Sequence, residues 1–138
     1  MRKRTRAREL GLQVLYRMDI THDTYEVSLN NLWQAHTEET IEEEVKNFTC
    51  ELVKGVADNF EVIDKKIAQY ATNWQLERMA VVDRNILRLC SFELMFRPDI
   101  PPKVSINEAV ELAKKYSDKE AAKFVNGVLD KIKLKQDQ

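Results

Sequence analysis

The sequence predicts an all-α protein of about seven helices in two small packed sub-bundles, with no sheet. Three observations support this prediction. Apolar residues recur at helical spacing along most of the chain, and no useful stretch alternates with the period of two that marks a half-buried strand. Three glycines and three prolines are also too few for the many turns of an all-β fold. The 138 residues fit a single domain, with expected sub-bundles at about 1–59 and 60–138 and a frayed tail at about 133–138.

The segment Met79–Phe96 is the predicted central helix. It contains neither glycine nor proline, and Pro98 ends it. Its apolar residues cover more than one face, which is typical of a helix buried in the middle of a bundle. Its polar residues form a narrow strip that we expect to face water: Asp83, Arg84, Arg88 and Glu93.

Six further helices are predicted from the same periodicity, at about 5–21, 24–36, 40–58, 61–71, 105–116 and 117–132. Thr5 is the expected cap of the first helix. Four further units have the spacing of a capping box, in which a Ser or Thr side chain and a Glu or Gln three residues later satisfy the first backbone donors. These units are Thr40–Glu43, Thr72–Gln75, Ser105–Glu108 and Ser117–Glu120.

Composition argues against a membrane protein and against an enzyme. No run approaches the roughly 20 apolar residues of a membrane span, and the basic N-terminus lacks the apolar region of a signal peptide. Cys50 and Cys90 lie in apolar helical patterns, which predicts reduced thiols in a cytoplasmic protein. The sequence has no Gly-rich phosphate loop, no metal-ligand cluster and only two histidines. We therefore expect no catalytic residues, no metal and no cofactor.

The net charge of −1 conceals a strongly basic N-terminus. Five cations occur within the first eight residues: Arg2, Lys3, Arg4, Arg6 and Arg8. They lie at the start of a predicted helix, where the helix dipole repels cations and an anion would offset that repulsion. Arginine and aromatic side chains together can hold single-stranded RNA, and Tyr70 and Phe124 are the candidate aromatics. Core packing of these two rings and a solvated basic tail remain the alternatives.

Four segments resemble the NusB family of transcription antitermination factors. They are RTRARELGLQVLY at 4–16, DRNILRLCSFEL at 83–94, PKVSINEAVELAK at 102–114 and KFVNGVLD at 123–130. The segments follow the family's order and span nearly the whole chain. Thr5 departs from the pattern, because relatives often have another basic residue there.

The resemblance implies an RNA-binding antitermination factor of two helical bundles. Such a factor binds the boxA element of ribosomal-operon RNA together with NusE, a small-subunit ribosomal protein, and helps RNA polymerase read through terminators. Some family members self-associate, so a homodimer is a further expectation. The alternatives are a helical domain related to the N-terminal part of ribosomal-RNA cytosine methyltransferases, and a bundle that binds only proteins.

The resemblance also assigns site residues. The positions that match the family's RNA surface are Arg4, Arg6, Arg8, Tyr70, Arg88, Glu120, Lys123 and Phe124. Tyr16 and Asp83 match positions that meet NusE. Asp83 and Arg88 would then face different partners from the polar strip of the central helix.

Overall fold

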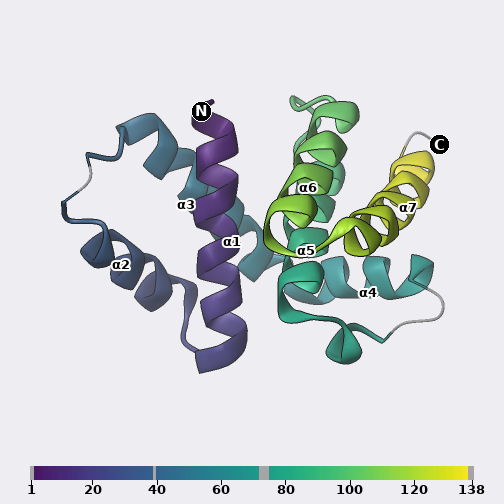
Figure 1. Ribbon diagram of the computed structural model, residues 1–138, viewed down its shortest axis with the longest axis horizontal. Helices are drawn as coiled ribbons and strands as arrows, with labels where there is room; N and C mark the ends of the chain where they lie inside the picture. Colours follow the sequence, from purple (N-terminus) through teal and green to yellow (C-terminus); the bar gives the residue numbers. More distant parts are fainter. Residues whose placement is uncertain (1, 39, 72–74, 137–138) are drawn as a thin grey trace.

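The computed structural model describes residues 2–38, 40–71 and 75–136, and within these ranges the regular structure is entirely helical (Figure 1). The all-α prediction is therefore confirmed. The elements are α1 (Lys3–Thr21), α2 (Tyr25–Ala35), α3 (Glu43–Asp58), α4 (Phe60–Tyr70), a short 3-10 helix η1 (Leu76–Arg78), α5 (Val81–Phe96), α6 (Pro102–Tyr116) and α7 (Lys119–Gln136). None of the described helices is long and apolar enough to cross a membrane.

Helix α5 lies at the centre of the molecule, as its apolar pattern predicts. It contacts α1, α3, α4, α6 and α7, and every residue from 85 to 93 is buried. Helix α1 packs against α2, α3 and α5, while α6 and α7 pack against each other and against α5 (Figure 1). Both α1 and α3 thus contact α5, which comes after the predicted boundary at residue 59. The division into sub-bundles stays a prediction.

The predicted caps of α1 and α3 are wrong. Helix α1 begins two residues before Thr5, whose hydroxyl donates to Glu108 Oε1 on α6 at 2.6 Å. Helix α3 begins only at Glu43, with Glu42 at the N-cap position, so Thr40 caps nothing. In the first case a partner from another helix takes the hydroxyl that the local pattern assigns to a cap.

The starts of the last two long helices also differ from the predicted boxes. Helix α6 begins at Pro102, a residue whose fixed φ suits the first helical turn, so Ser105 lies inside the helix. Helix α7 is capped by Asp118 rather than by Ser117, because Asp118 Oδ1 accepts from the backbone N–H of Ala121 at 2.7 Å. Helix α7 then continues through Gln136, beyond the point at which fraying is predicted.

The central helix starts later than the sequence predicts. Helix α5 starts at Val81 instead of Met79, after the single turn of η1. The expected Thr72–Gln75 box begins within residues 72–74, which lie outside the described residues. Gln75 takes the N-cap position of η1 without a capping side-chain hydrogen bond.

Candidate nucleic-acid interface

The basic N-terminus is a docked helix and not a solvated tail. Lys3 is in the first turn of α1, and its Nζ lies 3.0 Å from Glu42 Oε2 and 3.3 Å from Glu44 Oε2. Hydrogen bonds and attraction from these two carboxylates raise the pKa of Lys3 above its usual value. Thr49 on α3 also donates to the carbonyl of Ala7 at 3.3 Å. The basic N-terminal end of α1 is therefore held in a defined position against α3.

Arg4 and Arg6 reach the surface of this docked helix. Arg4 is exposed, and its guanidinium carbon lies 4.4 Å from the centroid of the Phe48 ring, which belongs to α3. No ion pair joins Arg4 to the described residues. Arg6 is half-buried, with Nη1 3.6 Å from Glu9 Oε1. These two arginines are the predicted RNA contacts of α1 that solvent reaches.

Arg8 is buried, so its predicted role as an RNA contact is not supported by the structure. Only 2% of its side chain is exposed, and it binds Glu93 through two hydrogen bonds, Nε to Oε2 at 2.9 Å and Nη2 to Oε1 at 2.7 Å. Arg8 Nη1 also lies 3.4 Å from Glu108 Oε1. Burial lowers the pKa of Arg8, but these two carboxylates outweigh it and raise the pKa. Arg8 holds α1 against α5 and α6.

Arg88 is also buried, for the same physical reason. Its side chain is 6% exposed and forms a two-bond pair with Asp64 on α4, at 2.8 and 3.0 Å. Its Nη1 also donates to Asp19 Oδ2 on α1 at 2.9 Å, and its guanidinium stacks 4.4 Å from the ring centroid of Phe60. These contacts use both edges of the guanidinium. The expectation that Arg88 faces RNA is therefore corrected to a role in joining α1, α4 and α5.

The polar strip of the central helix is largely dry, contrary to the prediction. Glu93 is 1% exposed, and it accepts from the Ser105 hydroxyl at 2.7 Å as well as from Arg8. Arg84 is half-buried and pairs with Asp19 at 2.9 Å. The strip is thus a set of interhelical ion pairs, with Asp83 as the member that lies beside an open pocket.

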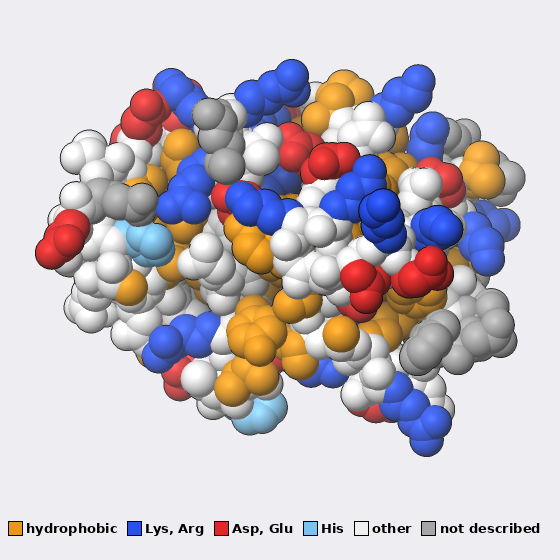
Figure 2. All heavy atoms as spheres, in the orientation of Figure 1, with side chains coloured by type: hydrophobic (Ala, Val, Ile, Leu, Met, Phe, Trp, Pro, Cys, Tyr) orange, Lys and Arg blue, Asp and Glu red, His pale blue; other side chains and the backbone are white. Residues whose placement is uncertain are grey.

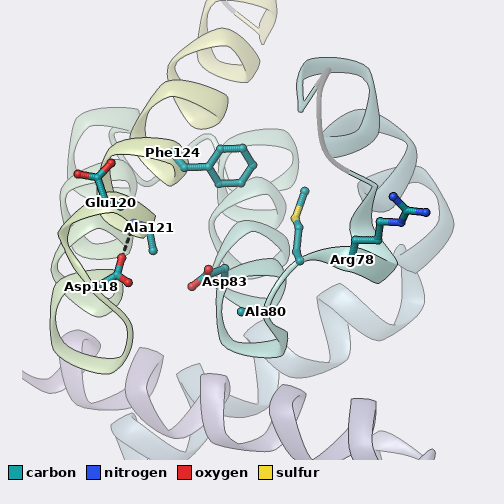
Figure 3. A pocket seen from close by; sticks show the side chains of 8 residues that line it. Arg78, Ala80, Asp83, Asp118, Glu120, Ala121 and Phe124 are labelled. Carbon is teal, nitrogen blue, oxygen red and sulfur yellow. Dashed lines mark hydrogen bonds between the residues drawn. The ribbon is translucent and has the colours of Figure 1, made fainter.

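That pocket lies between η1, the start of α5 and the start of α7, and has a volume of about 430 Å³ (Figure 3). It brings three predicted site residues together: Asp83, Glu120 and Phe124. Asp83 Oδ1 is buried and has no hydrogen-bond donor among the described residues. Figure 3 shows the half-buried ring of Phe124 above the Asp83 carboxylate. Residues that the sequence assigns to RNA and to a protein partner therefore line one pocket.

The charges around the pocket are mixed rather than basic. Asp118 joins Asp83 and Glu120 among its lining residues, and Arg78 is its one cationic lining residue. Lys123 is exposed beside it, with Nζ 3.7 Å from Glu120 Oε1. In Figure 2, Lys and Arg side chains gather over the upper and right parts of the visible face, interspersed with acidic groups. These parts of the view are occupied by α6, by α7 and by the N-terminal end of α1.

Comparison with known proteins identifies the family. The model of the NusB family matches residues 5–133. The chain belongs to the NusB family. It is 48% identical over 130 residues to "Transcription antitermination protein NusB" of Anaeromyxobacter dehalogenans, covering 94% of this chain and 89% of the relative. The protein of that name from Myxococcus xanthus is 44% identical over 133 residues, covering 96% and 95%.

Solved structures agree with this assignment. T. maritima NusB superposes with a TM-score of 0.86 at 36% identity, covering 95% of this chain and 90% of that one. A chain of the structure described as antitermination factors NusB and NusE in complex with dsRNA superposes with a TM-score of 0.88 at 31% identity, covering 98% of each. The family is one of non-enzymatic transcription antitermination factors, and the alternative of a methyltransferase-related domain is not favoured.

The two tyrosines that the resemblance assigns to this NusB-family chain differ in access. Tyr16 on α1 is 43% exposed, so a partner can reach its ring. Tyr70, at the end of α4, is half-buried against the core, and its hydroxyl is buried with no partner among the described residues. Its ring is therefore less available for stacking on a base than a surface aromatic.

The sequence does not reveal that Phe48 contacts Arg4, one of the candidate RNA-binding residues. The position of Phe48 in the apolar stripe of α3 indicates a core residue, and it is indeed only 5% exposed. The structure adds that its ring carries Arg4 from a different helix. No local pattern in α3 reports this contact, because it depends on how α1 packs against α3.

Proposed function

We propose that this NusB-family chain is a cytoplasmic RNA-binding antitermination factor that binds boxA RNA together with NusE, within a complex that modifies RNA polymerase. The observation that carries the proposal is the basic end of α1, which is docked as a helix yet leaves Arg4 exposed and without an ion pair to the described residues. Relatives named as transcription antitermination proteins, and a structural neighbour solved with NusE and dsRNA, support the same function.

The proposed RNA contacts are the accessible members of the predicted set. Arg4 and Arg6 supply phosphate contacts from α1, and Lys123 supplies one from α7, beside the half-buried ring of Phe124. Glu120 modulates RNA affinity at Lys123, because its carboxylate lies 3.7 Å from the Lys123 ammonium and competes with a phosphate for that ammonium. Arg8 and Arg88 contribute indirectly, through the buried pairs that hold α1 in place.

NusE is the proposed protein partner, with Tyr16 and Asp83 in the interface. An exposed tyrosine offers the large amphipathic ring that is enriched at interface hot spots. The buried, unpaired Oδ1 of Asp83 needs a hydrogen-bond donor, and a partner's side chain would supply it. A homodimer formed through this surface would compete with NusE for it.

A salt titration tests the proposal. We would measure binding of a fluorescent boxA RNA and a scrambled control by anisotropy, with and without NusE, between about 50 and 300 mM salt. Each single-strand phosphate contact lowers log affinity by roughly 0.7 per log unit of salt, so three to five contacts predict a slope of about −2 to −4. We expect that slope, a preference for boxA, and tighter binding with NusE.

The second candidate function is that of a bundle that binds only proteins, and the carboxylates around the pocket favour it. It predicts that NusE binds normally while boxA and scrambled RNA bind equally weakly in its presence. That result would overturn the RNA-binding proposal. It would leave the assignment of Tyr16 and Asp83 to a protein interface intact.

A further inference from the structure

We propose that Phe48 is a positioning residue for RNA binding, whose buried ring holds the Arg4 guanidinium by stacking and leaves its N–H groups free for a phosphate. This inference rests on the proposed function, because it concerns how one of the proposed RNA contacts is presented. The short distance of 4.4 Å between the guanidinium carbon of Arg4 and the ring centroid is its starting point.

The way Arg4 is held differs from the way its neighbours are held. Lys3 is paired with Glu42 and Glu44, Arg6 lies 3.6 Å from Glu9, and Arg8 is bound by Glu93. In each of these cases a nearby carboxylate offsets the positive charge, and for Arg8 it also takes up N–H donors. A ring attracts the flat face of a guanidinium through its quadrupole and uses none of the N–H donors at the edge. Stacking therefore fixes Arg4 while keeping it fully charged.

The Phe48 ring is itself immobilised, which a platform requires. It is 5% exposed within α3, and the guanidinium carbons of Arg8 and Arg97 each lie 5.5 Å from its centroid. Both of those arginines are already bound by carboxylates, so neither is free to bind RNA in place of Arg4. Arg4 is the exposed arginine of the three.

Arg97 binds the carboxylates nearest this ring, one of which, Asp99, also attracts Arg4 at longer range. It binds both oxygens of Asp99, at 2.9 and 3.0 Å, and donates to Glu51 Oε2 at 3.1 Å. Arg97 follows the last residue of α5, so the end of α5 places the Arg97 guanidinium over the Phe48 ring. Holding Arg4 in one orientation before RNA arrives lowers the conformational entropy that a flexible arginine would lose on binding.

The test is a double-mutant cycle on boxA binding in the presence of NusE. Phe48→Leu keeps an apolar side chain but removes the π face, and we expect RNA affinity to fall about two- to fivefold, the value of one exposed cation–π contact. In an Arg4→Ala background, Phe48→Leu should change affinity by less than about 1.5-fold, because the group it positions is gone. Phe92→Leu, which also removes a buried ring, is the matched control and should leave RNA affinity unchanged.

A second measurement uses the wild-type protein and needs no variant. The ring current of Phe48 should shift the Arg4 δ-protons upfield in NMR spectra, and this shift should persist when boxA RNA is added. Loss of the shift in the RNA complex would overturn the proposal. The proposal would also be overturned if Phe48→Leu lowered RNA affinity equally in the wild-type and Arg4→Ala backgrounds. That result would show that Phe48 has a purely structural role.

The outcome is separable from failure of the proposed function. If boxA RNA does not bind wild-type protein even with NusE, the proposed function fails. If it binds and Arg4→Ala alone has no effect, Arg4 is not an RNA contact and the inference about Phe48 fails while RNA binding stands.

Discussion

Arg8 on α1 and Glu93 on α5 form a two-bond ion pair in the interior, with side chains only 2% and 1% exposed. Arg8 lies one helical turn after Arg4, so the pair fixes the end of α1 that carries the exposed cations. Ser105 donates to the same carboxylate, and Glu108 accepts from Thr5 while it lies beside Arg8. Three helices are thus joined below the proposed RNA surface.

We expect Glu93→Gln to reduce the free energy of unfolding by about 3 kcal/mol, because it leaves the buried Arg8 without its main counter-charge. Urea unfolding followed by circular dichroism measures the change. Glu111→Gln is the control, since Glu111 is 70% exposed in a surface pair with Lys114 and should change stability by less than about 0.5 kcal/mol. Equal losses in the two variants would contradict a stabilising role for the Arg8–Glu93 pair.

Arg4→Ala and Arg8→Ala should separate RNA binding from stability. Arg4 is exposed, so its removal should leave stability within about 0.5 kcal/mol and reduce the magnitude of the salt slope for boxA binding by about 0.7. Arg8→Ala should destabilise the protein by about 3 kcal/mol, since it strands the Glu93 carboxylate in the core. Urea unfolding and the anisotropy titration, made on both variants, check this. The assignment fails if Arg4→Ala destabilises as much as Arg8→Ala.

The sequence predicts the helices and the burial of α5 well, because apolar periodicity reports directly on which faces are covered. It predicts the helix starts poorly. The Ser105–Glu108 unit has the spacing of a capping box, yet both residues serve the Arg8–Glu93 cluster instead. A hydroxyl and a carboxylate are equally suited to a cap and to a tertiary contact, and only the packing of α1 against α6 decides between them.

The same limit applies to the candidate site. Counting cations locates the basic end of α1, but it does not distinguish the exposed Arg4 from the buried Arg8. One signal was available: Arg88 and Glu93 lie inside the apolar run of the central helix, where a charge is expected to have a partner. That reasoning would have marked both as members of buried pairs and Arg88 as a poor candidate for RNA contact.

Asp83→Lys should weaken NusE binding more than binding of RNA alone. The aspartate has a buried oxygen without a donor at the edge of the pocket, so reversing its charge removes the acceptor that we assign to the partner. We expect at least a tenfold loss in NusE affinity, measured by calorimetry, and less than a threefold change for boxA RNA without NusE. Glu26→Lys makes the same charge change at an exposed residue of α2, and should affect neither affinity. Equal losses for NusE and RNA would remove Asp83 from the protein interface.

Asp19 should make stability depend on pH in the acid range. Burial raises the pKa of Asp19, but hydrogen bonds from Arg84 and Asn85 and the charge of Arg88 outweigh burial and hold the pKa below its usual 3.8. A carboxyl with a lowered pKa contributes stability above its unfolded pKa of about 3.9, and that contribution is lost as pH falls through the folded value. Asp19→Asn should therefore be less stable than wild type at pH 6, with a difference that shrinks towards pH 3. Urea unfolding at several pH values measures it, and a constant difference would contradict the assignment.

Gly55→Ala and Gly127→Ala should have opposite effects on stability. A Cβ at Gly55 on α3 would lie 2.2 Å from Cζ of Phe92, whose ring is 7% exposed in the core and has little room to move. Such overpacking typically costs about 1–3 kcal/mol. A Cβ at Gly127 on α7 meets no atom within 4 Å, so the better helix propensity of alanine should stabilise the protein by about 0.5–1 kcal/mol. Because both positions are helical, the propensity gain is shared, and the difference measured by urea unfolding isolates the clash with Phe92. Equal stabilisation by the two alanines would show that α3 and α5 can move apart at this contact without cost.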